Sequence, residues 1–344
     1  MAVTDAFAAG GRLRDPFIFI SICLLLDLVL GDPQYALHPI RLAGRLLSSS
    51  ESVLRRMGLH GRFGGVLLFL FLFFACGGFV FAVAFAIYGA ARPVIGPAWS
   101  AVLEWIWEAY IGYSLLALGD LVRHGLRISR SVDRGDLPGA RSAAAMLVGR
   151  DVDKMDFSAC NRAAVESLAE SLCDGVIAPL FWFVLLGLPG LLLFKVASTM
   201  DSMVGYRDER YLRFGWFGAR LDDAMNWIPA RLCVVLIAAV SAAVPGYSAR
   251  LALRVARAQH ALLPGPNKGW SETAAAGALG IRLAGPIWKN GNLVNKLWIG
   301  PPEGREGGSS RDVTRMITLA YAATVLFMGL AWLWLRTGWS VRPF

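Results

Sequence analysis

The feature that most constrains this chain is an uncharged apolar run over residues 63–88. This run is longer than the about 20 residues that an α-helix needs to cross the hydrocarbon core of a bilayer. A second apolar run covers residues 313–335 and ends in tryptophans, which are typical of a membrane–water interface. Only 17% of the 344 residues are charged, and the mean hydropathy is +0.51. Together these features predict an all-α, polytopic integral membrane protein.

Further apolar runs are weaker candidates for spanning helices, because each is short or is interrupted by charged residues or prolines. These runs cover residues 17–30, 99–118, 176–194 and 232–244. We therefore expect about four to six transmembrane or re-entrant helices, joined by helical cytoplasmic loops.

The distribution of lysine and arginine predicts which segments face the cytoplasm. The two longest polar segments of the N-terminal half are rich in these residues, as cytoplasmic loops are, so the N-terminus is expected outside. Segment 195–231 is also basic, although simple alternation would place it outside. We expect runs 176–194 and 232–244 to dip into the membrane and return, since irregular backbone is tolerated there when protein or water covers it. Residues 1–344 then form one membrane-embedded domain with cytoplasmic catalytic segments at about 31–62, 119–175, 195–231 and 245–312.

Charge, cysteines and motifs exclude several classes of protein. The net charge of +9 comes mostly from arginines that flank apolar runs, which favours the positive-inside pattern over nucleic-acid binding. The five cysteines are scattered without a C-x-x-C pair, so neither a disulfide framework nor a structural zinc site is expected. The N-terminus does not resemble a signal peptide. Walker A, GxGxxG, HExxH and GxSxG motifs are absent from the sequence.

An acidic cluster occurs in the segment ESLAESLCDG. Its carboxylates, Glu166, Glu170 and Asp174, are spaced i, i+4, i+8, which places them on one face of an α-helix. Like charges in a column repel one another, so the cluster would gain from a bound cation. Mg²⁺ is the natural candidate, because it uses one or two carboxylates plus substrate phosphates. The alternative is a solvated helix face paired with Arg150 and Arg162.

A second charged cluster lies in segment 195–227, which we expect to form a loop, a short helix, a turn at 214–215 and a second helix. Asp222, Asp223 and Asn226 then share one helical turn. Arginines of this segment suit bidentate binding of phosphate or carboxylate groups: Arg207, Arg210 and Arg213. The alternative is an amphipathic segment that lies on anionic lipid headgroups.

Two further polar segments are candidates for binding. GDPQYALHPIRLAGR contains His38, which suits a general base or a phosphate contact, although a lone loop histidine is more often structural. In GPNKGWSETAAAGALGIRLAGP, Ser271 is a good N-cap, and helix N–H groups beside Lys268 can form an anion site. An ordinary capped helix is the alternative. Residues 249–263 read as a basic amphipathic helix, and residues 300–310 as a flexible linker. Asp151 or Asp156 can cap a further helix that reaches Cys173.

These segments, in this order, resemble the adenosylcobinamide-phosphate synthase family of cobalamin biosynthesis. The resemblance extends from residue 26 to residue 286, and one departure is Gly265-Pro266-Asn267-Lys268, where a Ser-Pro-Asn-small pattern is expected. The stretches that carry it are DLVLGDPQYALHPIRLAGRL, LVGRDVDKMD, ESLAESLCDGVIAPLFW, STMDSMVGYRDERYLRFGWFGARLDDAMNWIPARL and GPNKGWSETAAAGALGIRLAGP.

The resemblance implies an inner-membrane amide ligase with a cytoplasmic active site. Such an enzyme joins adenosylcobyric acid to (R)-1-aminopropan-2-ol or its O-phosphate with ATP and Mg²⁺, and the corrinoid is a substrate rather than a prosthetic group. The expected partners are these substrates and the lipid bilayer, with no nucleic acid. Other cobalamin-biosynthesis enzymes and a second copy of the chain are compatible partners. The alternative functions are a non-enzymatic membrane sensor and a corrinoid-binding scaffold or transporter.

The residues and the resemblance together give a set of expected site residues. The catalytic candidates are Glu166, Glu170, Asp201, Asp222 and Asp223. The metal candidates are Glu166, Glu170 and Asp174. The substrate-binding candidates are Asp32, His38, Arg41, Lys195, Ser202, Arg207, Arg220, Asn226, Asn267, Lys268 and Glu272.

Overall fold

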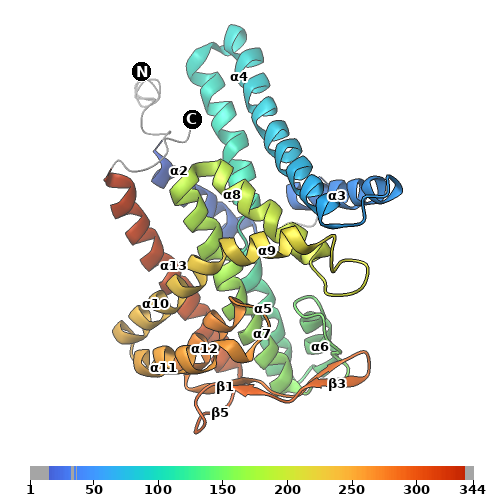
Figure 1. Cartoon of the computed structure of the whole chain (residues 1–344). Helices are drawn as coiled ribbons and strands as arrows, with labels where there is room; N and C mark the ends of the chain where they lie inside the picture. Colours follow the sequence, from blue (N-terminus) through green and yellow to red (C-terminus); the bar gives the residue numbers. More distant parts are fainter. Residues whose placement is uncertain (1–14, 32–34, 36, 338–344) are drawn as a thin grey trace. The chain divides into compact units, whose positions relative to one another are not determined.

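The computed structural model describes residues 15–31, 35 and 37–337 as a mainly helical fold with a few short strands (Figure 1). The helices are α2 (Pro16–Leu30), α3 (Pro39–Arg56), α4 (Arg62–Ser114), α5 (Leu118–Asp133), α6 (Leu137–Ala145), α7 (Phe157–Ser171), α8 (Ala178–Val204), α9 (Trp216–Met225), α10 (Trp227–Ala243), α11 (Ala249–Gln259), α12 (Lys268–Leu279) and α13 (Ser310–Arg336), with a π-helix, η1 (Leu172–Ile177), and a 3-10 turn, η2 (His260–Leu262).

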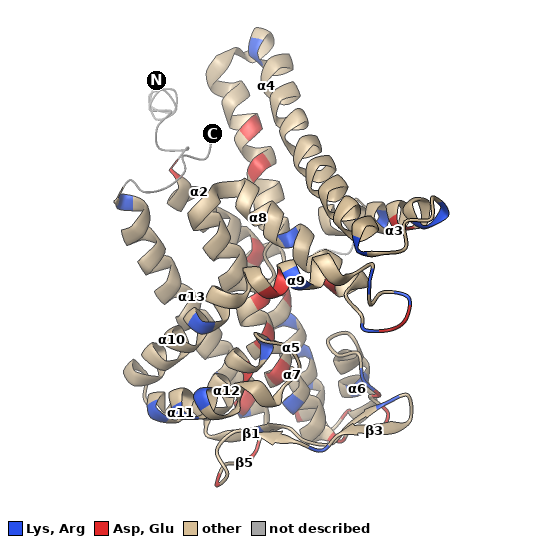
Figure 2. Cartoon of the chain, viewed as in Figure 1, with Lys and Arg blue, Asp and Glu red and all other residues tan. Residues whose placement is uncertain are grey.

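Four helical segments of the described chain are long and apolar enough to cross a membrane. They are Arg62–Asp133, Phe157–Val204, Trp216–Ala243 and Ser310–Arg336. Figure 2 shows that the arms of α4 and the length of α13 carry few charged residues. The predicted class, an all-α polytopic membrane protein, is confirmed.

The chain divides into two compact units, each built from separate stretches of sequence. The first comprises Met1–Ala117, Pro179–Met225 and Ala331–Phe344, and the second comprises Leu118–Ala178 and Asn226–Leu330. Each unit therefore brings together residues that lie far apart in the sequence.

In the first unit, α4 is two helical arms joined at a sharp break. Gly96 has a φ of 79° inside the helix, and Pro93 and Pro97 flank it. Glycine adopts this left-handed backbone without a Cβ clash, and proline cannot donate the helical hydrogen bond, so the break falls where the sequence allows it. The two arms run side by side (Figure 1). The Trp107 indole N–H on the second arm donates a 2.9 Å hydrogen bond to the Val80 carbonyl on the first. The runs predicted at 63–88 and 99–118 correspond to these arms.

Helix α8 is also broken, at Gly187, which has φ 66° and ψ −155° and precedes Pro189. The arm before Gly187 continues directly from η1 and α7, and the whole segment Phe157–Val204 is one of the four that are long and apolar enough to span. The re-entrant topology of this segment therefore stays a prediction. The expectation of a loop after residue 195 is wrong, because α8 continues to Val204. The predicted turn at 214–215 is confirmed, and α9 follows it.

In the second unit, α7 begins as predicted and ends in an unexpected way. The Asp156 carboxylate accepts a 2.7 Å hydrogen bond from the Ala159 N–H, which confirms it as the N-cap. After Ser171 the chain forms the π-helix η1, whose hydrogen bonds span five residues instead of four. This change of register moves Asp174 out of the column that an uninterrupted α-helix would form with Glu166 and Glu170.

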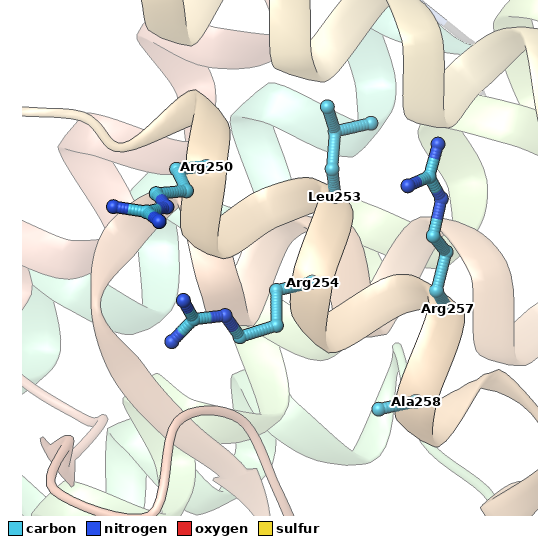
Figure 3. A pocket seen from close by; sticks show the side chains of 5 residues that line it. All are labelled: Arg250, Leu253, Arg254, Arg257 and Ala258. Atoms are coloured by element: carbon cyan, nitrogen blue, oxygen red, sulfur yellow. The ribbon is translucent and has the colours of Figure 1, made fainter.

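Helices α11 and α12 pack against each other in the second unit. The apolar side of α11 is buried, and the predicted basic side is confirmed: Figure 3 shows Arg250, Arg254 and Arg257 projecting from this helix, where they line a pocket. Helix α12 begins at Lys268 with Asn267 as its N-cap residue. The prediction of Ser271 as the N-cap is therefore wrong, and its hydroxyl instead donates to the Lys268 carbonyl at 3.3 Å.

The segment between α12 and α13 folds into short strands rather than a flexible linker. The strands are β1 (Ile281–Ala284), β2 (Ile287–Lys289), β3 (Asn292–Asn295), β4 (Trp298–Ile299) and β5 (Arg305–Glu306). The three-stranded sheet has the order β4-β1-β5. Strand β1 pairs with β4 in the antiparallel sense and with β5 in the parallel sense, and β2 and β3 form a separate antiparallel hairpin. Arg305 also pairs with the buried carboxylate of Asp312 at 2.8 Å, which fixes the segment predicted as a linker.

Candidate functional site

The second unit contains a cavity of about 360 Å³ where α7, α12 and β2 meet. Charged side chains of both signs line it, and three of them are carboxyl groups. The charged lining residues are Arg150, Glu166, Glu170, Glu272 and Lys289. Figure 2 shows both acidic and basic residues around α7 and α12. The acidic side chains predicted on α7 therefore lie beside basic side chains from other segments of the sequence.

Glu166 is held at both carboxylate oxygens. Its Oε2 accepts a 2.8 Å hydrogen bond from Arg150 Nη2, and its Oε1 accepts one of 2.9 Å from the Ala284 N–H. The side chains of Glu166 and Arg150 are each only 12% exposed. A carboxylate with a charged partner and a backbone donor is fixed in position and is neutralised.

Ala284 has a backbone conformation that is uncommon for a residue with a side chain. Its φ is 62°, in the left-handed region. Its N–H points to Glu166, and its carbonyl accepts a 3.0 Å hydrogen bond from Arg162 Nε. Backbone strain of this kind costs about 1–3 kcal/mol and persists only where its surroundings determine it. The strain therefore lies directly at the acidic cluster.

Glu170 and Lys268 form an ion pair at the rim of the cavity. Lys268 Nζ lies 2.7 Å from Glu170 Oε1, with side-chain exposures of 52% and 36%. Lys268 is the first residue of α12, and Glu170 is one turn after Glu166 on α7. This partly exposed pair leaves room for a ligand to replace one of its partners.

Glu272 lies one helical turn after Lys268 and is 9% exposed. Its carboxyl group has neither a hydrogen bond nor an ion pair with the described residues. Burial raises the pKa of Glu272 well above its usual range, and the charges of Glu170 and Glu166 raise it further, against an opposite effect of Lys268 and Arg150. The cavity therefore favours the neutral acid form of Glu272.

The predicted magnesium ligands are not gathered into one cluster. Within the described ranges, no group of three His, Cys, Asp or Glu side chains is arranged to hold a metal ion. Glu166 is occupied by Arg150, Glu170 by Lys268, and Asp174 lies in the π-helix. Glu166 and Glu170 line the same cavity, whereas Asp174 does not. The metal role of these residues stays a prediction.

A stack of aromatic and basic side chains holds the loop before α12. The Arg231 guanidinium lies 4.2 Å from the ring centroid of Trp227 and 5.0 Å from that of Trp270, which stacks on His260 at 3.8 Å. Arg231 also donates a 3.3 Å hydrogen bond to the side chain of Asn267. This places Asn267, a predicted binding residue, beside Lys268. No local sequence pattern marks the stack, because its members come from three separate segments.

The first unit contains most of the other predicted residues. Lys195, Asp201 and Ser202 lie on α8, and Asp222, Asp223 and Arg220 lie on α9. Lys195 lines an apolar cavity of about 830 Å³ between α3, α4 and α8. Arg220 and Asp223 are 4.0 Å apart on an exposed surface.

The remaining predicted site residues lie near the start of a helix or in a connection between helices. His38 is buried as the residue before α3, and Arg41 is exposed on α3. Arg207 is exposed in the connection between α8 and α9. Asn226 is buried at the start of α10. Asp32 lies outside the described residues.

The neighbouring Arg210 has a structural partner in the first unit. Its Nη2 lies 2.9 Å from Glu51 Oε1, and Arg55 donates to the same oxygen at 2.7 Å. The bond to Glu51 raises the pKa of Arg210. Of the three arginines predicted to hold anions, Arg210 is therefore already engaged by a protein carboxylate.

The fold and this cavity define a polytopic helical membrane protein with a charged pocket in its helical polar segments. The family model described as "CobD/Cbib protein" matches residues 20–320. The chain therefore belongs to the CobD/Cbib family, which confirms the resemblance seen in the sequence.

Individual relatives agree with this assignment. The chain is 39% identical over 312 residues to "Cobalamin biosynthesis protein CobD" of Pelobacter propionicus, covering 90% of this chain and 92% of the relative. It is 41% identical over 281 residues to the protein of that name from Geobacter metallireducens, covering 81% and 85%. It is 35% identical over 313 residues to "Cobalamin biosynthesis protein CbiB" of Salmonella arizonae, covering 90% and 94%. No solved structure matches the chain.

Proposed function

We propose that this chain is an ATP-dependent amide ligase of cobalamin biosynthesis. It joins the carboxylate of adenosylcobyric acid to the amine of (R)-1-aminopropan-2-ol or its O-phosphate and gives adenosylcobinamide or its phosphate. Family membership and the names of the relatives support the pathway. The site in the second unit supports the type of chemistry.

The observation that carries the ligase proposal is the cavity in which Glu166, Glu170 and Glu272 meet Arg150 and Lys268. ATP-dependent amide formation activates a carboxylate as an acyl phosphate, which an amine then attacks. The first step needs positive charge near the phosphoryl group. The second needs an acceptor for the amine proton. The cavity supplies groups of both kinds.

The residues around the cavity also fit a magnesium ion that arrives on nucleotide phosphates. Mg²⁺ then takes only one or two protein carboxylates and keeps several waters. Glu170 is the natural ligand, because it is partly exposed and its partner is a flexible lysine side chain. The bound metal would neutralise charge on the transferring phosphoryl group. Lys268, released from Glu170, would remain close enough to bind a phosphate oxygen as a point charge.

The proposed location is the inner membrane, with the catalytic segments on the cytoplasmic side, where ATP is available. The helices that are apolar enough to span support a multi-pass protein. The basic polar segments support the sidedness through the positive-inside pattern.

The test is conversion of adenosylcobyric acid by the purified full-length protein in detergent, with ATP, Mg²⁺ and either amine. Product formation that requires ATP is the expected result. Glu170→Gln should lower turnover and raise the Mg²⁺ concentration for half-maximal rate. Glu303→Gln, the same change at an exposed residue, serves as the control. Corrinoid binding without ATP-dependent product would refute the ligase and favour a scaffold or transporter.

A further inference from the structure

Glu272 differs from the other two carboxyl groups of the cavity in having no bonded partner. Glu166 receives hydrogen bonds at both oxygens, and Glu170 is paired with Lys268. Glu272 is nine-tenths buried, lines the same cavity and has no hydrogen bond or ion pair with the described residues. A carboxyl group that lines a cavity and has no partner from the described chain can take its partner from a ligand that enters the cavity.

The groups around Glu272 make the cavity suitable for a small cation. Glu166 and Glu170 belong to α7, Lys268 lies on the same helix as Glu272, and Arg150 and Lys289 also line the cavity. Arg150 and Lys268 are each bonded to one of the other glutamates, and Lys289, the third basic residue at the cavity, forms no ion pair with Glu272. An ammonium group that entered the cavity would supply this missing partner.

The other elements that pack against α12 add no further charged side chain to the lining of the cavity. Helices α7, α10 and α11, η2 and β1 contact α12. Their remaining titratable or basic side chains do not line the cavity: Cys160, Arg162, Arg231, Cys233, Arg250, Arg254, Arg257, His260 and Arg282.

We propose that Glu272 is the general base that removes a proton from the ammonium group of the amine substrate. This inference rests on the proposed ligase function and assigns the amine to the cavity between α7 and α12. It gives Glu272 a catalytic role rather than the binding role that the sequence suggested.

The electrostatics of the cavity support this role. An aliphatic ammonium has a pKa near that of lysine, about 10.4, whereas an ordinary glutamate is a weak base with a pKa of about 4.3. Burial raises the pKa of Glu272 and so narrows this gap. General bases work best when their pKa lies near the working pH. Arrival of the cation would favour ionisation of Glu272 at the moment when a base is needed.

The proposed step balances in atoms and charge. The Glu272 carboxylate accepts one proton from the ammonium, so that an N–H bond breaks and an O–H bond forms. The free amine attacks the acyl phosphate carbon, the C–N bond forms, and the C–O bond to phosphate breaks. The phosphate leaves with the electron pair and takes the second amine proton. Glu272 then releases its proton to solvent, which accounts for the one proton produced per turnover.

The test compares two nucleophiles in the full-length protein with adenosylcobyric acid, ATP and Mg²⁺. One is 1-aminopropan-2-ol, which is protonated at neutral pH, and the other is hydroxylamine, which is not. With the amino alcohol, Glu272→Gln should lower kcat at least about 100-fold, the lower end of general-base effects. With hydroxylamine, the variant should form the hydroxamate at nearly the wild-type rate. Glu303→Gln should leave both rates unchanged.

A second variant and the pH profile distinguish the loss of a base from a change in folding. Glu272→Asp keeps the carboxyl group and should retain an intermediate rate with the amino alcohol and a full rate with hydroxylamine. The fall of the wild-type rate at acidic pH should disappear in the Gln variant. Equal losses with both nucleophiles, or no loss with the amino alcohol, would overturn the base assignment. A wild-type protein that forms neither product would instead overturn the ligase itself.

Discussion

The pair formed by Arg150 and Glu166 provides a quantitative test of the candidate site. Both side chains are 12% exposed, and Glu166 also accepts from the Ala284 N–H. Glu166→Ala would leave a buried guanidinium and a backbone donor without partners, and breaking a buried pair costs about 3–5 kcal/mol. Glu166→Gln keeps an oxygen for Ala284 but loses the charge-assisted bond, for which we expect about 1.5–3 kcal/mol.

A double-mutant cycle separates the pair from the other effects of each substitution. Arg150→Met and Glu166→Gln, alone and combined, should give a coupling energy of about 2 kcal/mol, within the range for contacting residues. The matched control is the exposed pair Arg282–Glu306, at 3.4 Å with side-chain exposures of 33% and 56%. Its coupling energy should be about 0.2–1 kcal/mol. The assay is equilibrium chemical unfolding in detergent, followed by tryptophan fluorescence.

Equal coupling energies for the two pairs would contradict a buried, water-excluded ion pair between Arg150 and Glu166. That result would mean that water screens Arg150 and Glu166 as it screens a surface pair. Glu166 would then lie on an open face of α7, and its carboxylate would be neither neutralised nor fixed in position.

Three further predictions concern sidedness, recognition and pH. A cysteine at Ser202, in a background without the five free native cysteines, should be protected from an impermeant thiol reagent in intact cells, and labelling from outside would contradict the re-entrant topology. Arg207→Lys should lower activity at limiting substrate at least about tenfold, or about 1.4 kcal/mol, if its planar fork binds an anion; near-normal rates would leave segment 205–215 as a membrane anchor. The pKa of Glu272 is raised in the folded state, so this residue ionises in the unfolded chain first as pH rises above about 4.3. Glu272 therefore lowers the free energy of unfolding as pH increases toward its folded pKa. Glu272→Gln should therefore raise the thermal unfolding midpoint at neutral pH, with a difference that shrinks toward about pH 4; a constant difference would contradict the assigned ionisation.

Features that depend on neighbouring residues could be predicted from the sequence. Asp156 was one of two predicted N-caps, with Asp151, because its side chain needs only the first turn of α7 to find its donor. The apolar runs of α4 and α13 were found for a similar reason, since length and composition alone decide whether a helix can span. The helix break at Gly96 fits the same pattern, because glycine and proline determine it locally.

The arrangement of the site could not be predicted, because it depends on distant contacts. The Ala284 N–H reaches Glu166 across 118 positions of sequence, and no local pattern marks that pairing. The π-helix that displaces Asp174 inserts a residue without any change in the apolar pattern around it. Strand β5 has only two residues, too few for alternation to be visible, so its segment resembled a linker. Ser271 was a wrong cap prediction because the helix begins earlier, at Lys268.

The left-handed backbone of Ala284 limits which amino acids can replace it. A β-branched side chain is the least compatible with this conformation, whereas glycine adopts it freely and asparagine and aspartate tolerate it. In a library randomised at this codon, glycine and asparagine should therefore be recovered in functional clones, and valine and isoleucine should be depleted. This residue has no charge and no reactive atom, yet its backbone conformation restricts substitution at a position that contacts both Glu166 and Arg162.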